Sequence, residues 1–195
     1  SIFGLLLLVL PPAGFMSIIA VSAAMAMEIY DFSVQQYGLI FACAGLSILA
    51  GSALNQALVA RFELMTLIRA GVGLMAAACL QLLLIAWLGE APFWWVWTSV
   101  CTYMFSVALV LANATVLALD PLPKVAGVAS SIIGTSQNIA GASGALLAAS
   151  IYNGTVTNAV MIMGTIGTLV AVTYLMKPVI CPKPFVHHPA ELARD

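Results

Sequence analysis

Charged residues are scarce in this chain of 195 residues: they make up 7% of it, whereas apolar residues make up 63%. A soluble domain carries about 25% charged residues, because its surface must face water. Too few charges are present to cover a soluble surface of that kind, so the outer face of the folded chain must meet lipid. The mean hydropathy of +1.12 agrees with this conclusion. With only six lysines and arginines, no nucleic-acid partner is expected.

Catalytic and metal-binding motifs are also missing. The sequence has no HExxH, no GxSxG and no glycine-rich phosphate loop after a strand. Its two histidines are adjacent in a polar tail, far from any acid within an apolar run. The four cysteines are Cys43, Cys79, Cys101 and Cys181, and no pair of them has a spacing typical of a disulfide or a metal site. We therefore expect no enzyme, no cofactor and no metal site, and cysteines that act as small apolar side chains.

Long apolar runs are what the sequence does have. A helix needs about 20 mostly apolar residues to span a bilayer, and six runs reach that length. Lipid cannot satisfy a bare backbone, and the runs are too long for barrel strands, so we predict an all-α membrane protein with six transmembrane helices. The runs cover residues 2–29, 37–60, 66–88, 93–119, 125–152 and 158–176. The chain thus divides into a six-helix transmembrane domain, residues 1–176, and a C-terminal tail, residues 177–195.

The few charges are placed asymmetrically along this pattern. Short connections make neighbouring helices antiparallel, so six crossings put both termini on one side. That side carries every basic residue, namely Arg61, Arg69, Lys124, Lys177, Lys183 and Arg194. The opposite side carries only acidic residues, namely Glu28, Asp31 and Glu90. Because basic residues favour the cytoplasmic side, we predict that both termini and the tail are cytoplasmic.

Polar residues gather on one face of the fourth run. Ser99, Thr102, Ser106 and Asn113 are spaced by three, four and seven residues, which places them on one side of a helix. An Asn at membrane depth needs a partner or water. Two interpretations stay open: a hydrogen bond to a neighbouring helix, or the wall of a substrate cavity. On the first run, which Pro11 and Pro12 bend, the further cavity candidates are Ser17 and Met25.

Small residues recur along the fifth run. Gly134 and Gly141 belong to a stripe with a seven-residue period, which is nearly two helical turns. Small residues let two helices approach closely in a membrane. The neighbouring amides of Gln137 and Asn138 interrupt the stripe. It is either a site of tight helix packing or a sliding surface against a partner domain, and the two interpretations are compatible.

Four segments resemble one family of transporters. They read SAAMAMEIYDFSVQQYGLIF at residues 22–41, GSALNQALVARF at 51–62, ALVLANATVLAL at 108–119 and AGVASSIIGTSQNIAGA at 126–142. In this order and spacing they resemble the second half of the Bcr/CflA-type drug:proton antiporters of the major facilitator superfamily. The sequence departs from the family pattern at Ala23, Glu63 and Ala112.

The resemblance implies a fold and a function. The six helices would be the seventh to twelfth of a twelve-helix transporter in a bacterial inner membrane. The first and fourth would line the cavity, the second and fifth would meet the missing N-terminal half, and the third and sixth would face lipid. The function implied is efflux of drugs or other small molecules by proton antiport. The alternatives are a structural or assembly membrane protein without transport, and a degenerate half-transporter.

Overall fold

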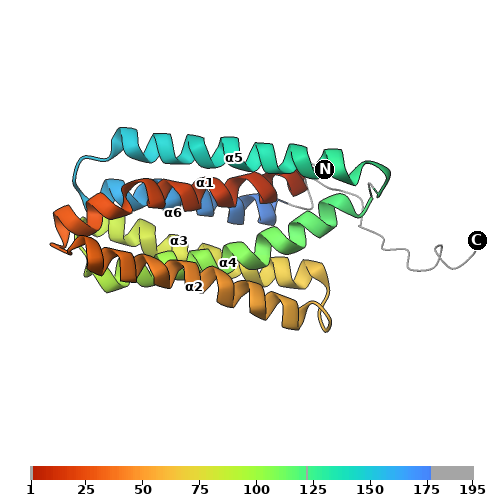
Figure 1. Ribbon diagram of the computed structural model, residues 1–195, viewed down its shortest axis with the longest axis horizontal. Coiled ribbons are helices and arrows are strands. Elements are labelled where there is room, and N and C mark those ends of the chain that lie inside the picture. Colours follow the sequence, from red (N-terminus) through yellow and green to blue (C-terminus); the bar gives the residue numbers. More distant parts are fainter. Residues whose placement is uncertain (1, 122, 177–195) are drawn as a thin grey trace, which may run out of the picture.

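The computed structural model describes residues 2–121 and 123–176, which form six α-helices and no strand within these ranges (Figure 1). The helices are α1 (Ile2–Ala24), α2 (Val34–Leu58), α3 (Leu64–Leu88), α4 (Phe93–Leu119), α5 (Ala126–Ile151) and α6 (Val156–Leu175). A π-helical turn η1 (Met25–Ile29) continues α1, and a short 3₁₀ turn η2 (Pro123–Val125) precedes α5. The predicted all-helical class is confirmed. The predicted tail lies outside the described residues.

Local capping sets the helix ends that the apolar runs left imprecise. The Ser33 hydroxyl accepts a hydrogen bond from the Gln36 backbone N–H (3.2 Å), and the Gln36 side chain accepts one from the Ser33 N–H (2.8 Å). This capping box starts α2 three residues before the predicted run. At the end of α3, Gly89 takes a left-handed conformation with φ of 79°, which a residue without Cβ adopts freely.

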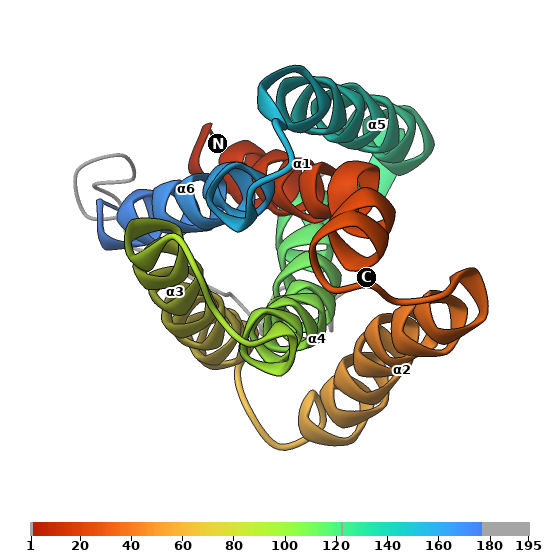
Figure 2. The same ribbon diagram turned by 90° about the vertical axis from the view of Figure 1, so that its left-hand side faces the viewer.

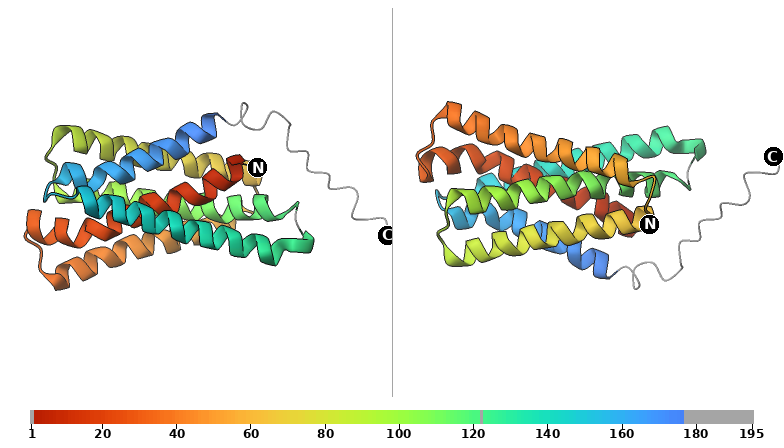
Figure 3. Two further views of the ribbon diagram at one scale, coloured as in Figure 1. Left: turned by 90° about the horizontal axis from the view of Figure 1, so that it is seen from above. Right: turned by 90° about the horizontal axis from the view of Figure 1, so that it is seen from below.

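Five of the helical segments are long and apolar enough to cross a membrane: Phe3–Ile29, Val34–Leu58, Leu64–Leu88, Phe93–Leu119 and Val156–Leu175. Helix α5, the fifth of the six predicted spans, does not belong to this set, because serines, threonines and amides lower its hydropathy. Its 26 residues are nevertheless long enough, at about 1.5 Å per residue, to run beside α1 through the bundle (Figure 3).

Successive helices run in alternating directions (Figure 1). The start of α1, the connection at 59–63, residues 120–121 and 123–125 of the next connection, and the end of α6 lie at one end of the bundle, called here the N-terminal end. The connections at 30–33, 89–92 and 152–155 lie at the opposite end. The predicted placement of both termini of the transmembrane domain at one end is therefore what the described residues show.

Helices α1 and α4 form the centre of the bundle (Figure 2). Helix α1 packs on α4, α5 and α6, and α4 packs on α1, α2 and α3, while α3 and α6 pack on each other. If α1, α2 and α3 are exchanged with α4, α5 and α6 respectively, the same pairs of helices are in contact. The two sets of helices are also evenly spaced in the sequence, because α4, α5 and α6 begin 91, 92 and 92 residues after α1, α2 and α3.

Two glycines make the closest helix approaches at equivalent places. A Cβ on Gly144 of α5 would collide with the backbone oxygen of Ala13 in α1. A Cβ on Gly51 of α2 would collide with the backbone oxygen of Phe105 in α4. Because glycine has no Cβ, each outer helix lies directly against the backbone of a central one.

A single aromatic side chain fills the crossing of the central helices. Tyr103 of α4 is completely buried, and its hydroxyl donates a hydrogen bond to the Pro11 carbonyl of α1 (3.0 Å). A Cβ on Gly14 would collide with this hydroxyl, and one on Gly167 of α6 would lie 2.9 Å from the tyrosine ring. The accepting carbonyl belongs to the first of two adjacent prolines inside α1, neither of which can donate a backbone hydrogen bond, so Tyr103 joins this part of α1 to α4.

Candidate functional site: the open face between helices α2 and α5

One side of the two central helices is not covered by the rest of the chain. The exposed apolar residues of α1 and of η1, which continues it, are Leu5, Met16, Ala20 and Met27. On α4 the exposed residues are Trp94, Thr98, Ala112 and Val116. The spacing within each set puts its members on one helix face. Since α2 and α5 flank this side (Figure 2), we call it the open face.

The structure places most of the predicted cavity residues inside the bundle. Ser17 and Ser106 are fully buried, and their hydroxyls donate to backbone carbonyls of Gly14 (2.6 Å) and Tyr103 (2.7 Å) on their own helices. Met25 is buried in η1. These groups are satisfied locally and are not presented to the open face.

The polar residues in the first half of α4 lie in two different surroundings. Ser99 is buried, and its hydroxyl donates to the side-chain oxygen of Gln81 in α3 (2.9 Å). Thr102 is half-buried and follows the exposed Thr98, to whose carbonyl its hydroxyl donates (2.8 Å). Helix α3 therefore covers Ser99, whereas Thr102 stays partly exposed. Of the six predicted cavity residues, Thr102 lies nearest the open face.

Asn113 pairs with a residue that the sequence pattern did not single out. Its amide nitrogen donates to the Asn55 side-chain oxygen in α2 (2.6 Å) and to the Leu109 carbonyl (2.7 Å). Both asparagines are buried, with 1% of Asn113 and 9% of Asn55 exposed. Of the two interpretations of Asn113, the helix-to-helix hydrogen bond is the one that accounts for its amide in this structure.

We expect Asn113→Ala to lower the free energy of unfolding by about 1 kcal/mol, because it leaves the Asn55 oxygen unpaired in a buried place. A double-mutant cycle with Asn55→Ala should give a coupling energy of about 0.6–1.7 kcal/mol. A thiol at Asn113→Cys should resist water-soluble maleimides in the folded protein. Rapid labelling that slows with substrate would instead favour the cavity interpretation.

The candidate interface residues of α5 lie in unequal surroundings. A Cβ on Gly141 would lie 3.0 Å from Cγ of Met16 in α1, whereas one on Gly134 would meet nothing within 4 Å. Within the described residues, Gly134 therefore makes no close helix contact, and α5 approaches α1 most closely at Gly144. The interpretation of Gly134 as part of a surface against a partner domain stays a prediction. Gln137 is half-buried and Asn138 is exposed, so the amides point mainly away from this bundle.

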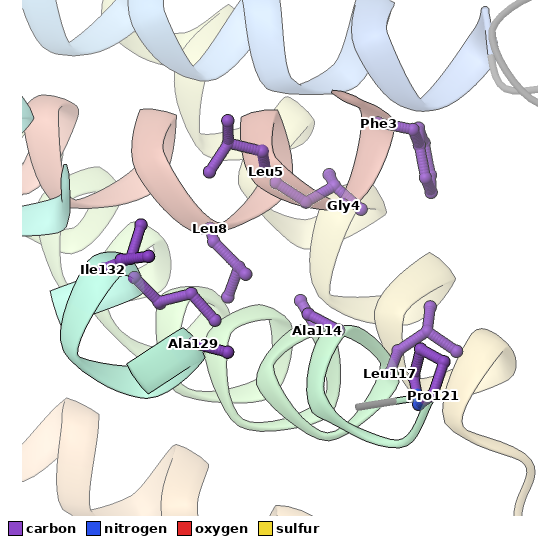
Figure 4. Close-up of a pocket in the computed structure, with 12 residues that line it drawn as sticks. Phe3, Gly4, Leu5, Leu8, Ala114, Leu117, Pro121, Ala129 and Ile132 are labelled. Atoms are coloured by element: carbon purple, nitrogen blue, oxygen red, sulfur yellow. The ribbon is translucent and has the colours of Figure 1, made fainter. Parts of the chain in front are cut away.

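The first half of α5 leaves space beside α1 and α4 (Figure 4). A cavity of about 270 Å³ lies there, near the N-terminal end of the bundle. Its lining is entirely apolar: Phe3, Gly4, Leu5, Leu7, Leu8, Ala114, Leu117, Ala118, Pro121, Ala129, Ile132 and Ile133. An apolar lining of this kind favours apolar molecules or chains.

Aromatic side chains fix the opposite end of the bundle. Phe93 contacts the rings of Tyr30, Phe32 and Trp97, and the Trp97 indole N–H donates to the Ile40 carbonyl (3.0 Å). These contacts join the connection at 30–33 to the start of α4. Burial raises the pKa of the Tyr30 phenol, whose hydroxyl donates to a backbone carbonyl.

The acidic side chain of Glu28 has one described partner. The Tyr152 hydroxyl, just after α5, donates to its carboxylate at 3.4 Å. Burial, followed by the nearby negative charge of Glu28, raises the pKa of the Tyr152 phenol. The contact therefore persists with tyrosine in its neutral form and ties the end of α5 to η1.

No group of three or more His, Cys, Asp or Glu that could hold a metal occurs in the described ranges.

No family model matches the sequence, and neither a curated protein nor a solved structure is significantly similar to it.

Proposed function

We propose that this chain is the six-helix half of a secondary transporter that moves small molecules by alternating access. The observation that carries the proposal is the internal repeat: the first three and the last three helices make equivalent helix contacts and begin at a nearly constant spacing in the sequence. Successive helices alternate in direction, so the two three-helix units have opposite orientations in the membrane. Inverted repeats of this kind, nested in each six-helix half, are typical of major facilitator transporters.

The open face supports a second six-helix unit as the partner. Helix α2 is the least buried of the five apolar spans, with 17% of its window buried, and most of α5 is exposed. Hydrocarbon cannot satisfy the exposed Asn138 amide or the half-buried Gln137. A partner half covering α2 and α5 would give these amides hydrogen-bond partners. It would also enclose the exposed stripes of α1 and α4 as a cavity.

The substrate class rests on the resemblance to drug:proton antiporters and on the chemistry of the open face. That face carries apolar and hydroxyl side chains, such as Met16 and Thr98, and suits lipophilic small molecules. In the described residues, no Asp, Glu, Lys or Arg lies in the central turns of a helix. A proton-coupling acid would therefore belong to the partner half.

A structural or assembly protein remains the second candidate, and one observation favours it. No buried side-chain polar atom in the described residues lacks a hydrogen-bond partner. The polar groups of the bundle interior, such as Ser99 and Asn113, are thus already satisfied without a ligand.

Drug susceptibility separates the two candidates. The natural gene product, expressed in bacteria lacking their main efflux pumps, should raise resistance to several lipophilic drugs, and a protonophore should abolish the effect. Gly134→Leu, at a position open in this bundle but facing the proposed partner, should remove resistance. The matched control is Gly73→Leu, at an exposed position of α3, where a Cβ would likewise meet nothing within 4 Å. No resistance from a folded protein across the panel would favour the assembly role.

We further propose that the N-terminal end of the bundle faces the bacterial cytoplasm. In the described residues this end carries Arg61, Arg69 and Lys124, whereas the opposite end carries Glu28 and Glu90. In a cysteine-free protein, a thiol introduced at Lys124 should react with impermeant maleimide only from the cytoplasmic side. A thiol introduced at Glu90 should react only from the other side. Labelling of both from one side would contradict this orientation.

A further inference from the structure

The apolar cavity near the N-terminal end of the bundle opens to the surface of the described residues. Two of its lining side chains, Phe3 and Leu8 of α1, are each only 1% exposed. Two others, Leu5 of α1 and Ile132 of α5, are 46% and 59% exposed. The cavity therefore has a buried wall inside the bundle and a mouth beside Leu5 and Ile132, through which an apolar chain can enter.

The cavity extends along the helix axes. Figure 4 shows Phe3 and Pro121 at one end of it and Leu8 and Ile132 towards the other. On α1 the lining residues run from Phe3 to Leu8, which is roughly 7 Å at about 1.5 Å per residue. The volume of about 270 Å³ is nearly twice that of a cavity of roughly 150 Å³, which holds a benzene ring. The space therefore fits a stretch of hydrocarbon chain that lies parallel to the helices.

A second hollow adjoins the cavity at the end of the bundle. It measures about 310 Å³, and its lining residues are Pro121, Pro123, Lys124 and Val125. Pro121 lines both spaces, so they meet just after the end of α4. Lys124 is exposed, and among the described residues its ammonium group has no ion-pair partner. The nearest acidic residue in the sequence, Asp120, lines neither space. The apolar cavity thus ends beside an available positive charge.

An apolar space that ends beside a cation suits an amphiphile with a hydrocarbon chain and an anionic head. Within a membrane, lipid chains are already in apolar surroundings, so the hydrophobic effect does not drive one into the cavity. A chain that fills the space instead restores the dispersion contacts that an empty cavity forfeits. The cation adds a preference among lipids, because a lysine near the membrane surface attracts anionic headgroups. Phospholipids of the surrounding membrane have both the chain and the head that this site requires.

We propose that the cavity between α1, α4 and α5 holds one acyl chain of an anionic phospholipid, whose phosphate lies against Lys124. The chain occupies the space lined by Phe3 and Leu8, and the headgroup occupies the hollow lined by Pro121 and Pro123. This arrangement puts the headgroup at the ends of the helices and the chain parallel to them, as in one leaflet of a bilayer. The site needs only the packing of these three helices and does not depend on the proposed transport function.

The charge of the headgroup can be tested by native mass spectrometry of the purified full chain in detergent. The two probes are dioleoylphosphatidylglycerol and dioleoylphosphatidylethanolamine, which has the same chains and no net charge. We expect one tightly bound phosphatidylglycerol per protein, held about fivefold more tightly than phosphatidylethanolamine. Lys124→Gln should remove this preference and leave the binding of phosphatidylethanolamine unchanged. Equal binding of the two lipids to the native protein, or an unchanged preference in Lys124→Gln, would overturn the proposal.

The place of the acyl chain can be tested by filling the cavity. Ala129 of α5 is half-buried and lines the cavity, so Ala129→Leu puts a larger apolar side chain into it. This variant should lose the tightly bound lipid of either kind. The matched control is Ala70→Leu, at an exposed position of α3 that does not line the cavity, and it should bind both lipids as the native protein does. Circular dichroism checks that both variants are folded, and a folded Ala129→Leu protein that retains its lipid contradicts the proposal. If Ala129→Leu does not fold, the exposed Lys124→Gln variant still decides the outcome.

Two further probes separate a phospholipid from other anions. Glycerol phosphate, which has the head without a chain, should neither bind nor displace phosphatidylglycerol. Oleate, which has the chain and a carboxylate, should bind more weakly than phosphatidylglycerol. Oleate that binds as tightly and displaces the phospholipid would make the occupant a free fatty acid, and the proposal would then be wrong.

Discussion

Gly144→Ala is expected to lower the free energy of unfolding by about 3 kcal/mol. The added Cβ would lie within 3.0 Å of the Ala13 backbone, and a helix backbone cannot move aside as a flexible side chain can. Helices α5 and α1 would have to separate along their shared contact. The measurement is denaturation of the purified protein in mild detergent, followed by circular dichroism.

The matched control for this prediction is Gly134→Ala on the same helix. It adds the same methyl group where nothing lies within 4 Å, so its effect should stay within about 0.5 kcal/mol. Similar unfolding midpoints for the two variants would mean that α5 is not held against α1 at Gly144. In that case the packing of α5 on α1 described above would be wrong.

Tyr103→Ala is expected to have an equally large effect, a loss of about 3–5 kcal/mol, because it leaves a cavity where three helices meet. Tyr103→Phe keeps the ring and removes only the hydrogen bond to the Pro11 carbonyl, which should cost about 1 kcal/mol. Comparing the two variants by denaturation separates the packing of the ring from the role of its hydroxyl.

A second glycine provides the control for that comparison. In Gly14→Ala the new Cβ collides first with the Tyr103 hydroxyl, so this substitution should be less harmful when combined with Tyr103→Phe. A double-mutant cycle should therefore show a coupling energy of about 1 kcal/mol or more. Strict additivity of the two substitutions would contradict the direct contact between these residues.

The helices themselves could be predicted from the sequence because length and hydropathy are local properties. The predicted boundaries of α1 with η1, and of α4, agree with the structure, and the start of α2 differs only because the Ser33 capping box was overlooked. The π-helical form of η1 could not be predicted, since no residue in Met25–Ile29 requires it.

The surroundings of the polar side chains could be predicted only in part. Periodicity places Ser99 and Asn113 on a helix face, but it does not identify the helix that will cover that face. Their partners, Gln81 and Asn55, lie on α3 and α2, and only the packing of the bundle brings them together. Asn55 is a polar residue within an apolar run, and that signal could have marked it as a candidate.

The same limit applies to the small-residue stripe of α5. The heptad spacing indicates one helix face, but it does not say where along that face α1 lies close. A Cβ on Gly141 would contact Met16 of α1, whereas one on Gly134 would meet nothing within 4 Å.

The register of the three-helix exchange has a consequence for how this sequence could diverge. Pro11 and Tyr103 are separated by 92 positions, within one residue of the offset of 91 between the starts of α1 and α4, and they touch each other at the helix crossing. They therefore occupy nearly equivalent places in the two three-helix units. Two tyrosines would compete there for one volume, and two prolines would leave that volume empty. A chain of this design cannot remain an identical duplicate at this crossing: one unit must supply the bulk and the other must make room for it.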